Sequence, residues 1–228
     1  MATENSHQVV VCKNGPYLVS GGAPLSLQKI KTDAAGDSLG WSPGRSFDSK
    51  ARYALCRCGQ SNTKPFCDGT HAKVGFDGTE TASKAPYEEL ATEIVGSTLV
   101  LNDAESLCAF ARFCDVAGSV WHLTENSDDP AARKLAIAQA QTCPSGRLVM
   151  RDEQEVYEPM LEASVALIED TAKECSGPIL LRGGIAVIAE DGEPYPVRNR
   201  QTLCRCGASQ NKPFCDGTHA EVGFVDGL

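Results

Sequence analysis

Long apolar runs are missing from this sequence, although 42% of its 228 residues are hydrophobic. A helix that crosses a bilayer needs about 18 or more consecutive apolar residues, and no such run occurs. The segment Met1–His7 is polar, contains Glu4 and has neither Lys nor Arg, so it lacks the features of a secretory signal and of a transit peptide. These absences predict a cytosolic protein without a membrane partner.

Basic residues are in the minority, with 21 Lys and Arg against 30 Asp and Glu and a formal net charge of −9. Nucleic-acid binding requires a basic surface that neutralises phosphates, so we expect no nucleic-acid partner. The basic residues that are present are clustered around cysteines, between Lys50 and Lys73 and between Arg198 and Lys212. No pairing of a nucleophile with a base and no substrate-pocket motif stands out, so we do not expect an enzyme.

Cysteine, in contrast, is abundant, with eleven residues in the chain. Reducing compartments disfavour disulfides, and clustered cysteines there bind metals or carry out redox chemistry. The odd number also argues against a simple disulfide framework. The cysteines therefore predict metal binding.

Two segments of the chain are nearly identical and align without gaps. Leu55–Phe76 reads LCRCGQSNTKPFCDGTHAKVGF, and Leu203–Phe224 reads LCRCGASQNKPFCDGTHAEVGF. Short β-prone runs precede each copy, and the first copy also contains an additional polar, Gly-rich stretch, Asp33–Ser49. The expected strands are Val9–Cys12, Tyr17–Ser20 and Leu25–Ile30 in the first copy, and Val165–Glu169, Ile179–Arg182, Ile185–Ala189 and Pro196–Arg198 in the second.

The duplication divides the chain into three modules, which we place at residues 1–80, 81–155 and 156–228. The middle module contains an expected strand at Thr98–Leu101, a short helix at Ala104–Arg112 and a longer helix that begins after Asp129-Pro130. The predicted fold class is α+β and mostly β. Neither outer module is large enough to form a secure core alone, so metal binding would have to contribute to its stability.

The repeated segment has the spacing C-x-C-x8-C-x3-H, which supplies three thiolates and one imidazole. Structural zinc is one interpretation, because three cysteines and one histidine are a common zinc set. Zinc pairs are usually separated by two to four residues, so the single intervening residue favours an iron–sulfur centre. The eight candidate ligands are Cys56, Cys58, Cys67, His71, Cys204, Cys206, Cys215 and His219.

Both segments resemble the CDGSH iron–sulfur domain, whose pattern C-x-C-x2-(S/T)-x3-P-x-C-D-G-(S/T)-H is filled completely in each copy. The resemblance implies one [2Fe–2S] cluster per motif, held by three cysteines and one exposed histidine. Family members with one motif dimerise, and members with two motifs can pair them within one chain. The resemblance therefore implies a NEET-like monomer with internal pseudo-two-fold symmetry. Such members are bacterial or organellar, and the missing presequence favours the bacterial cytosol.

The middle module contains a second kind of cysteine group, Cys108-x5-Cys114 and a remote Cys143-Pro144. It resembles single-cluster ferredoxins and their divergent relatives, with Ala111 where their central cysteine lies. Three ligands imply a third cluster, [3Fe–4S], or [4Fe–4S] with an outside ligand such as Cys12 or Cys175. The alternative is a degenerate domain whose cysteines are reduced and buried.

The preferred function is electron transfer, cluster transfer, or both, with a redox partner protein or an apo-acceptor of clusters as the partner. Replacing a thiolate by a neutral imidazole makes a cluster less negative and easier to reduce. Two alternatives remain: a redox or pH sensor with labile clusters, and an interaction scaffold stabilised by zinc.

Overall fold

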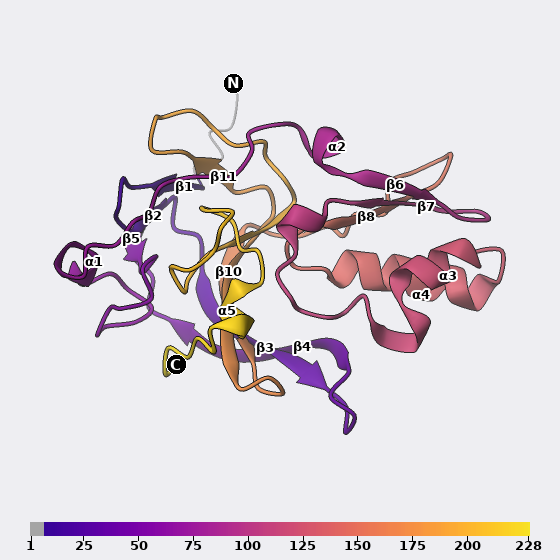
Figure 1. Ribbon diagram of the computed structural model, residues 1–228, viewed down its shortest axis with the longest axis horizontal. Coiled ribbons are helices and arrows are strands. Elements are labelled where there is room, and N and C mark those ends of the chain that lie inside the picture. The colour runs from indigo at the N-terminus through magenta and orange to yellow at the C-terminus, as the bar shows by residue number, and fades with distance from the viewer. Residues whose placement is uncertain (1–6) are drawn as a thin grey trace.

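The computed structural model describes residues 7–228, and the segment Met1–Ser6, which supports the prediction that a targeting signal is missing, lies outside the described residues. The fold is mostly β, and within residues 7–228 the strands form three sheets (Figure 1). No helix in that range is long and apolar enough to cross a membrane.

The first sheet takes three strands from the first repeat and one from the second. Its members are β1 (Gln8–Val11), β2 (Tyr17–Ser20), β5 (Arg52–Leu55) and β11 (Ala186–Ile188). Their order is β11-β1-β2-β5, with β1 parallel to β11 and the other pairs antiparallel. Side chains alternate between buried and more exposed along β1 and β2, as expected for strands with one face on a core.

The second sheet has the complementary composition. Its members are β3 (Leu25–Thr32), β4 (Ser38–Phe47), β9 (Ser164–Asp170), β10 (Cys175–Arg182) and β12 (Arg200–Leu203). The order is β12-β10-β9-β3-β4, and β3 of the first repeat runs parallel to β9 of the second. The two repeats thus exchange one strand each: β3 completes the sheet of the second repeat, and β11 completes the sheet of the first.

This exchange creates one hydrophobic core that belongs to both repeats. Residues from both sheets are at most 1% exposed and pack together: Val9, Tyr17, Val19, Leu25, Val165, Leu167, Ile179, Leu181, Val187 and Leu203. Two small modules therefore share one core of the size that neither has alone.

The middle segment folds as a separate three-stranded sheet covered by helices, at the opposite end of the long axis from the ligand loop of the first repeat (Figure 1). Its elements are α2 (Tyr87–Leu90), β6 (Thr92–Val95), β7 (Val100–Asp103), η1 (Glu105–Leu107), η2 (Val116–Gly118), α3 (Val120–Glu125), α4 (Pro130–Thr142) and β8 (Leu148–Arg151). As predicted, α4 begins after Asp129, whose carboxylate accepts the N–H groups of Ala131 and Ala132 at 3.3 and 3.2 Å.

Two of the expected elements are wrong. Instead of a helix over Ala104–Arg112, only η1 is helical, because Phe110 and Arg112 adopt positive φ angles of 54° and 59° that a helix does not allow. The expected strand at Pro196–Arg198 is absent from the described structure, and β12 begins at Arg200 instead. The polar stretch after Asp33 contains β4, which pairs antiparallel with β3.

A buried arginine joins the middle segment to the second repeat. Arg200 of β12 is 3% exposed, and its Nη1 atom donates to the carbonyl oxygens of Ala140, Gln141 and Cys143 at 2.8, 2.8 and 2.6 Å. These carbonyls lie at the carboxyl end of α4, where Ala140 also accepts the N–H of Cys143 and the helix offers few other donors. Its Nη2 atom also pairs with Glu158 at 2.6 Å. Arg200 therefore holds Cys143 against the strand that leads to Cys204.

Replacing Arg200 by Ala should lower the free energy of unfolding by about 3–5 kcal/mol, because a carboxylate and several carbonyl groups lose a buried partner. Arg151→Ala is the matched control, since Arg151 pairs with Glu93 at the surface and such pairs contribute about 0–1 kcal/mol. Urea denaturation of the full chain measures both. Equal losses for the two variants would contradict this assignment of Arg200.

Candidate iron–sulfur centres

Each repeated segment forms a loop that leaves a core strand and ends in one helical turn. The first loop follows β5 and ends in α1 (Thr70–Lys73), and the second follows β12 and ends in α5 (Thr218–Glu221). Asp68 shapes the first loop, because its carboxylate accepts the N–H groups of Asn62 and Thr70 at 2.9 Å each. These hydrogen bonds stabilise the charged carboxylate and so hold the pKa of Asp68 well below its usual range.

Asp216 has the same role in the second loop. Its carboxylate accepts the N–H groups of Gln210 and Thr218 at 2.7 and 3.1 Å. The N-terminal residues of the two turns are the left-handed Gly69 and Gly217, so each aspartate binds the helical turn from one position further upstream than a standard N-cap.

The predicted ligands of the first loop come together as two pairs. The Sγ atoms of Cys56 and Cys58 are 3.8 Å apart, and Sγ of Cys67 lies 3.3 Å from Nδ1 of His71. Two sulfurs bound to one tetrahedral metal at about 2.3 Å are roughly 3.8 Å apart. Each pair therefore fits one metal ion, and the loop fits two.

The second loop repeats this arrangement. The Sγ atoms of Cys204 and Cys206 are 3.7 Å apart, and Sγ of Cys215 lies 3.3 Å from Nδ1 of His219. Within residues 7–228, no group of three or more His, Cys, Asp or Glu side chains converges as the ligands of one metal ion would.

Backbone amides point at the sulfurs of both loops. The N–H groups of Gln60 and Gly69 lie 3.4 Å from the sulfurs of Cys58 and Cys67, and the N–H of Ala208 lies 3.4 Å from that of Cys206. Burial raises the pKa of the Cys58 thiol to about 11. When a metal cation binds such a thiol, the proton is released to solvent, and the amide donors then stabilise the thiolate.

The two loops meet through their glycines. A Cβ atom on Gly59 would lie 2.8 Å from the carbonyl oxygen of Cys206, and one on Gly207 would lie 2.8 Å from that of Cys58. Both glycines have positive φ angles, 74° and 81°. Each loop thus contacts, backbone to backbone, a predicted ligand of the other.

The third cysteine and the histidine form the histidine end of each loop, and these two ends differ in exposure. Cys67 and His71 are half-buried, and α1 has no buried residue. In the second loop Cys215 and His219 are only 3% and 4% exposed. Burial, with a contribution from the positive charge of Arg205, lowers the pKa of His219 to about 4.

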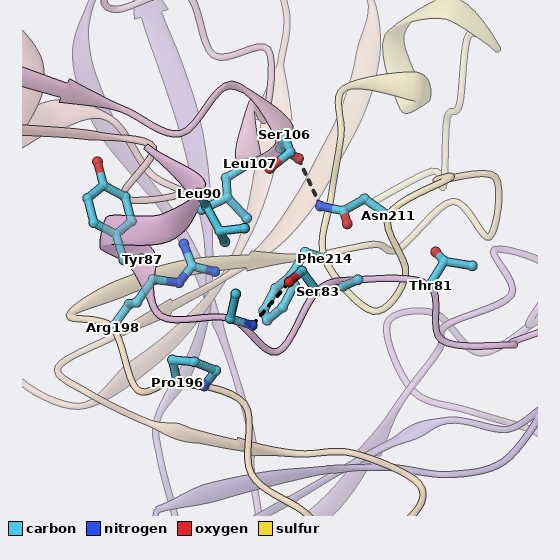
Figure 2. A pocket seen from close by; sticks show the side chains of 12 residues that line it. Thr81, Ser83, Tyr87, Leu90, Ser106, Leu107, Pro196, Arg198, Asn211 and Phe214 are labelled. Atoms are coloured by element: carbon cyan, nitrogen blue, oxygen red, sulfur yellow. Dashed lines mark hydrogen bonds between the residues drawn. The ribbon is translucent and has the colours of Figure 1, made fainter. Parts of the chain in front are cut away.

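The middle segment lies against this buried histidine end. A Cβ atom on Gly217 would be 3.4 Å from Cβ of Phe110 and 3.5 Å from the carbonyl oxygen of Cys108. Figure 2 shows Asn211 of the second loop reaching toward η1, where its side-chain amide donates to the carbonyl oxygen of Ser106 at 2.8 Å.

The arginine between the first two cysteines also has different partners in the two repeats. Arg205 pairs with Glu169 at 2.8 Å and with Asp226 at 2.5 Å. Arg57 is 1% exposed and donates only to carbonyl oxygens, those of Cys12 and Gly78. Within the described part of the chain no carboxylate forms an ion pair with Arg57.

The three cysteines predicted to hold a third cluster line one small cavity. Cys108, Cys114 and Cys143 surround it together with Phe113 and Arg147. Burial, reinforced by Asp115 and Cys143, raises the pKa of Cys114 to about 12. The donors and the neighbouring cation suit an anionic cluster.

Of the two outside ligands considered for this third site, Cys12 is excluded by its position. Its carbonyl group accepts a hydrogen bond from Arg57, beside the first loop. Cys175 begins β10, and it does not line the cavity. The structure thus places three cysteines, and neither of these two, around the third site.

Sequence reasoning missed Tyr17, whose hydroxyl donates to the carbonyl oxygens of Cys204 and Pro213 at 2.9 and 3.0 Å. Tyr17 belongs to the first repeat and supports the ligand loop of the second. Its sequence signal is the pair Pro16-Tyr17, which corresponds to Pro178-Ile179 in the second repeat.

Comparisons with known families match three separate segments of the chain. A family model described as an iron-binding zinc finger of CDGSH type matches residues 14–72 and 176–220. A model described as a divergent 4Fe-4S mono-cluster matches residues 94–153. No curated protein matches the chain.

Replacing Gly59 or Gly207 by Ala should lower the free energy of unfolding, because the new methyl group meets a carbonyl oxygen of the other loop. This loss should exceed the loss from backbone strain alone by about 1–3 kcal/mol. Gly36→Ala is the matched control, since Gly36 has a φ of 89° and a Cβ there meets nothing within 4 Å. Thermal unfolding of the metal-loaded proteins measures the difference. Similar losses for all three variants would show that the loops do not press on each other.

Proposed function

Because the chain carries two CDGSH-type iron-binding domains on either side of a divergent 4Fe-4S mono-cluster domain, we propose that it is an electron carrier that also passes clusters to acceptors. The supporting observation is the pairing of donors in each loop, two sulfurs and then a sulfur with an imidazole. This arrangement suits a [2Fe–2S] cluster with three cysteines and one histidine. Such a cluster would supply one-electron chemistry at each loop.

The protein's own residues would position and tune these centres. The eight proposed ligands are Cys56, Cys58, Cys67, His71, Cys204, Cys206, Cys215 and His219. Amides at positions such as Gln60 and Ala208 bind the sulfurs and favour the reduced state, in which the sulfurs carry more negative charge. Cys108, Cys114 and Cys143 would hold a third cluster, for which the matched family indicates the 4Fe–4S type.

The ligand loops form an uninterrupted series of contacts. The loop of Cys108 meets Gly217 of the second centre, and the second centre meets the first at Gly59 and Gly207. Backbone contact at Gly59 and Gly207, and the closeness of Gly217 to Phe110 and to the carbonyl group of Cys108, would keep neighbouring centres close, as electron transfer between them requires. The reciprocal strand exchange supports our proposal that the monomer is a pseudo-dimer, with modules at residues 1–80, 81–155 and 156–228.

The location and the partners of the protein follow from the same role. We propose a bacterial cytosolic carrier, without catalytic activity of its own, that meets a redox protein or an apo-acceptor. Nucleic acid and membranes are not among its proposed partners. Electron exchange with a ferredoxin reductase, compared with cluster loss to an apo-acceptor, separates the roles of carrier and sensor.

Protein purified without oxygen should be coloured and contain two iron and two inorganic sulfide ions for each CDGSH loop, with further iron if the middle site is filled. Iron and sulfide analysis with an electron paramagnetic resonance (EPR) spectrum counts the centres and distinguishes their types. Cys67→Ser should remove the signal of the first centre, and Cys175→Ser should leave all signals in place. Colourless protein with zinc alone would refute the proposal in favour of a zinc-stabilised scaffold.

The first centre should have the higher reduction potential, because Arg57 forms no ion pair among the described residues whereas Arg205 forms two. Asp226→Asn should raise the potential of the second centre, since it removes a buried negative charge. A unit charge about 10 Å away at an effective dielectric constant of about 20 changes a one-electron potential by about 70 mV.

EPR-monitored redox titration of the full chain measures both potentials. The control is Glu221→Lys, which introduces the lysine found at the equivalent position of the first repeat, Lys73. Glu221 is exposed, so solvent and salt screen its charge and the shift should be much smaller. A second centre that is the easier to reduce in the unmodified protein would contradict this charge argument.

A further inference from the structure

The two CDGSH loops have the same donors, but only one of them has an accessible histidine end. His71 and Cys67 are half-buried on a helical turn without buried residues. His219 and Cys215 are 4% and 3% exposed. Since the thiolates bind iron more strongly than a neutral imidazole does, the histidine end is where a centre opens to a chelator or an acceptor.

The loop between Cys108 and Phe113 of the middle domain lies beside the turn that carries His219, which also packs against β10. A Cβ atom on Gly217, two residues before His219, would lie 3.4 Å from Cβ of Phe110 and 3.5 Å from the carbonyl oxygen of Cys108. In Figure 1, α5 lies toward the middle domain, whereas α1 lies at the far end of the long axis, away from α3 and α4.

An ion pair and hydrophobic packing hold this loop against the second repeat. Nη1 of Arg112 pairs with Oδ2 of Asp170 at 2.5 Å, and the two side chains are 13% and 4% exposed. Ala111 and Phe113 pack with Ile168 and Leu180 in a small core of their own. Phe110 and Arg112 hold left-handed backbone conformations, which persist only where the surroundings enforce them.

The first two cysteines of each loop form its cysteine end. The exposure of these two ends differs less, and here the first loop is the more buried one. Cys206 is half-buried, and Cys58 is 7% exposed. Ring atoms of Phe224, from the C-terminal segment, lie 3.1 Å from a Cβ position on Gly59 beside Cys58. The cysteine end of the first centre is therefore closed and its histidine end is open, so exchange there is directed to His71.

We propose that the loop Cys108–Phe113 covers the histidine end of the second centre, so that the first centre exchanges iron, clusters and electrons with partners while the second is retained as an internal relay. This inference rests on the proposed function, because it presupposes a cluster at each loop. It assigns different tasks to two motifs whose ligand residues are identical.

Iron release from the fully loaded chain to excess EDTA, at one fixed pH and without oxygen, tests the assignment. Samples are reduced at intervals, and EPR is recorded at a temperature where two-iron signals remain sharp and four-iron signals broaden. The two-iron signals should decay in two phases of equal amplitude, the slower by about tenfold or more. His71→Cys should slow the fast phase, and His219→Cys should leave the fast phase unchanged.

Variants of the cover test its role. Arg112→Ala removes the anchor to Asp170 and should accelerate the slow phase at least severalfold. Phe110→Gly is a second test that keeps the backbone conformation, since glycine accepts a φ of 54° and Phe110 is already 41% exposed. Arg151→Ala, in a surface pair of the same domain, is the control and should leave both phases unchanged.

The outcomes separate this inference from the proposed function. Protein without iron and sulfide refutes the function itself. Protein with both centres that releases iron in a single phase, or in which His219→Cys slows the fast phase, refutes the assignment of exchange to the first centre alone. Unchanged slow phases in both Arg112→Ala and Phe110→Gly would show that the loop is not the cover.

Discussion

The reciprocal exchange of β3 and β11 is the constraint on which the rest of the structure depends. Each repeat lacks the strand that completes its sheet, and the other repeat supplies it in parallel pairing. The shared core follows from this exchange, and so does the contact between Gly59 and the carbonyl group of Cys206. The spacing of the two centres is thus set by sheets and backbone, which are far more rigid than surface side chains.

The middle domain disturbs the symmetry that this exchange creates. It is tied to the second repeat through Arg200 at the end of α4 and through the ion pair between Arg112 and Asp170. Its loop lies against Gly217, while the equivalent Gly69 has no atom within 4 Å of a Cβ position. Two motifs that a sequence comparison treats as interchangeable therefore have different surroundings in the folded chain.

Local sequence signals predicted those parts of the structure that depend on local interactions. Short β-prone runs indicated β1 and β2, and Asp129-Pro130 indicated the start of α4. The closeness of Cys67 to His71 and of Cys215 to His219 also followed from their spacing, because donors four residues apart lie near each other in a short loop, and their role as ligands stays a prediction. The strand exchange was not predictable in this way, since the apolar pattern of β3 is the same whichever repeat it pairs with.

The helix expected over Ala104–Arg112 failed for a related reason. Its residues are compatible with a helix, but the observed backbone is fixed by Asp170, which belongs to another repeat and binds Arg112. Contacts between residues far apart in the sequence override weak local propensity. The same limit applies to exposure: nothing within the second motif distinguishes His219 from His71, because the covering loop lies in another domain.

The electrostatic difference between the repeats shows how few substitutions such specialisation requires. Phe76 and Phe224 are equivalent, so Gly78 stands where the second repeat has Asp226. In the paired strands Val11 faces Tyr17 as Leu167 faces Ile179, which places Lys13 at the position of Glu169. The two carboxylates that pair with Arg205 are thus replaced in the first repeat by the exposed Lys13 and by Gly78, whose carbonyl oxygen accepts a hydrogen bond from Arg57. Because a buried charge is screened less than an exposed one, these two positions would change the potentials of the proposed centres without changing a single proposed ligand.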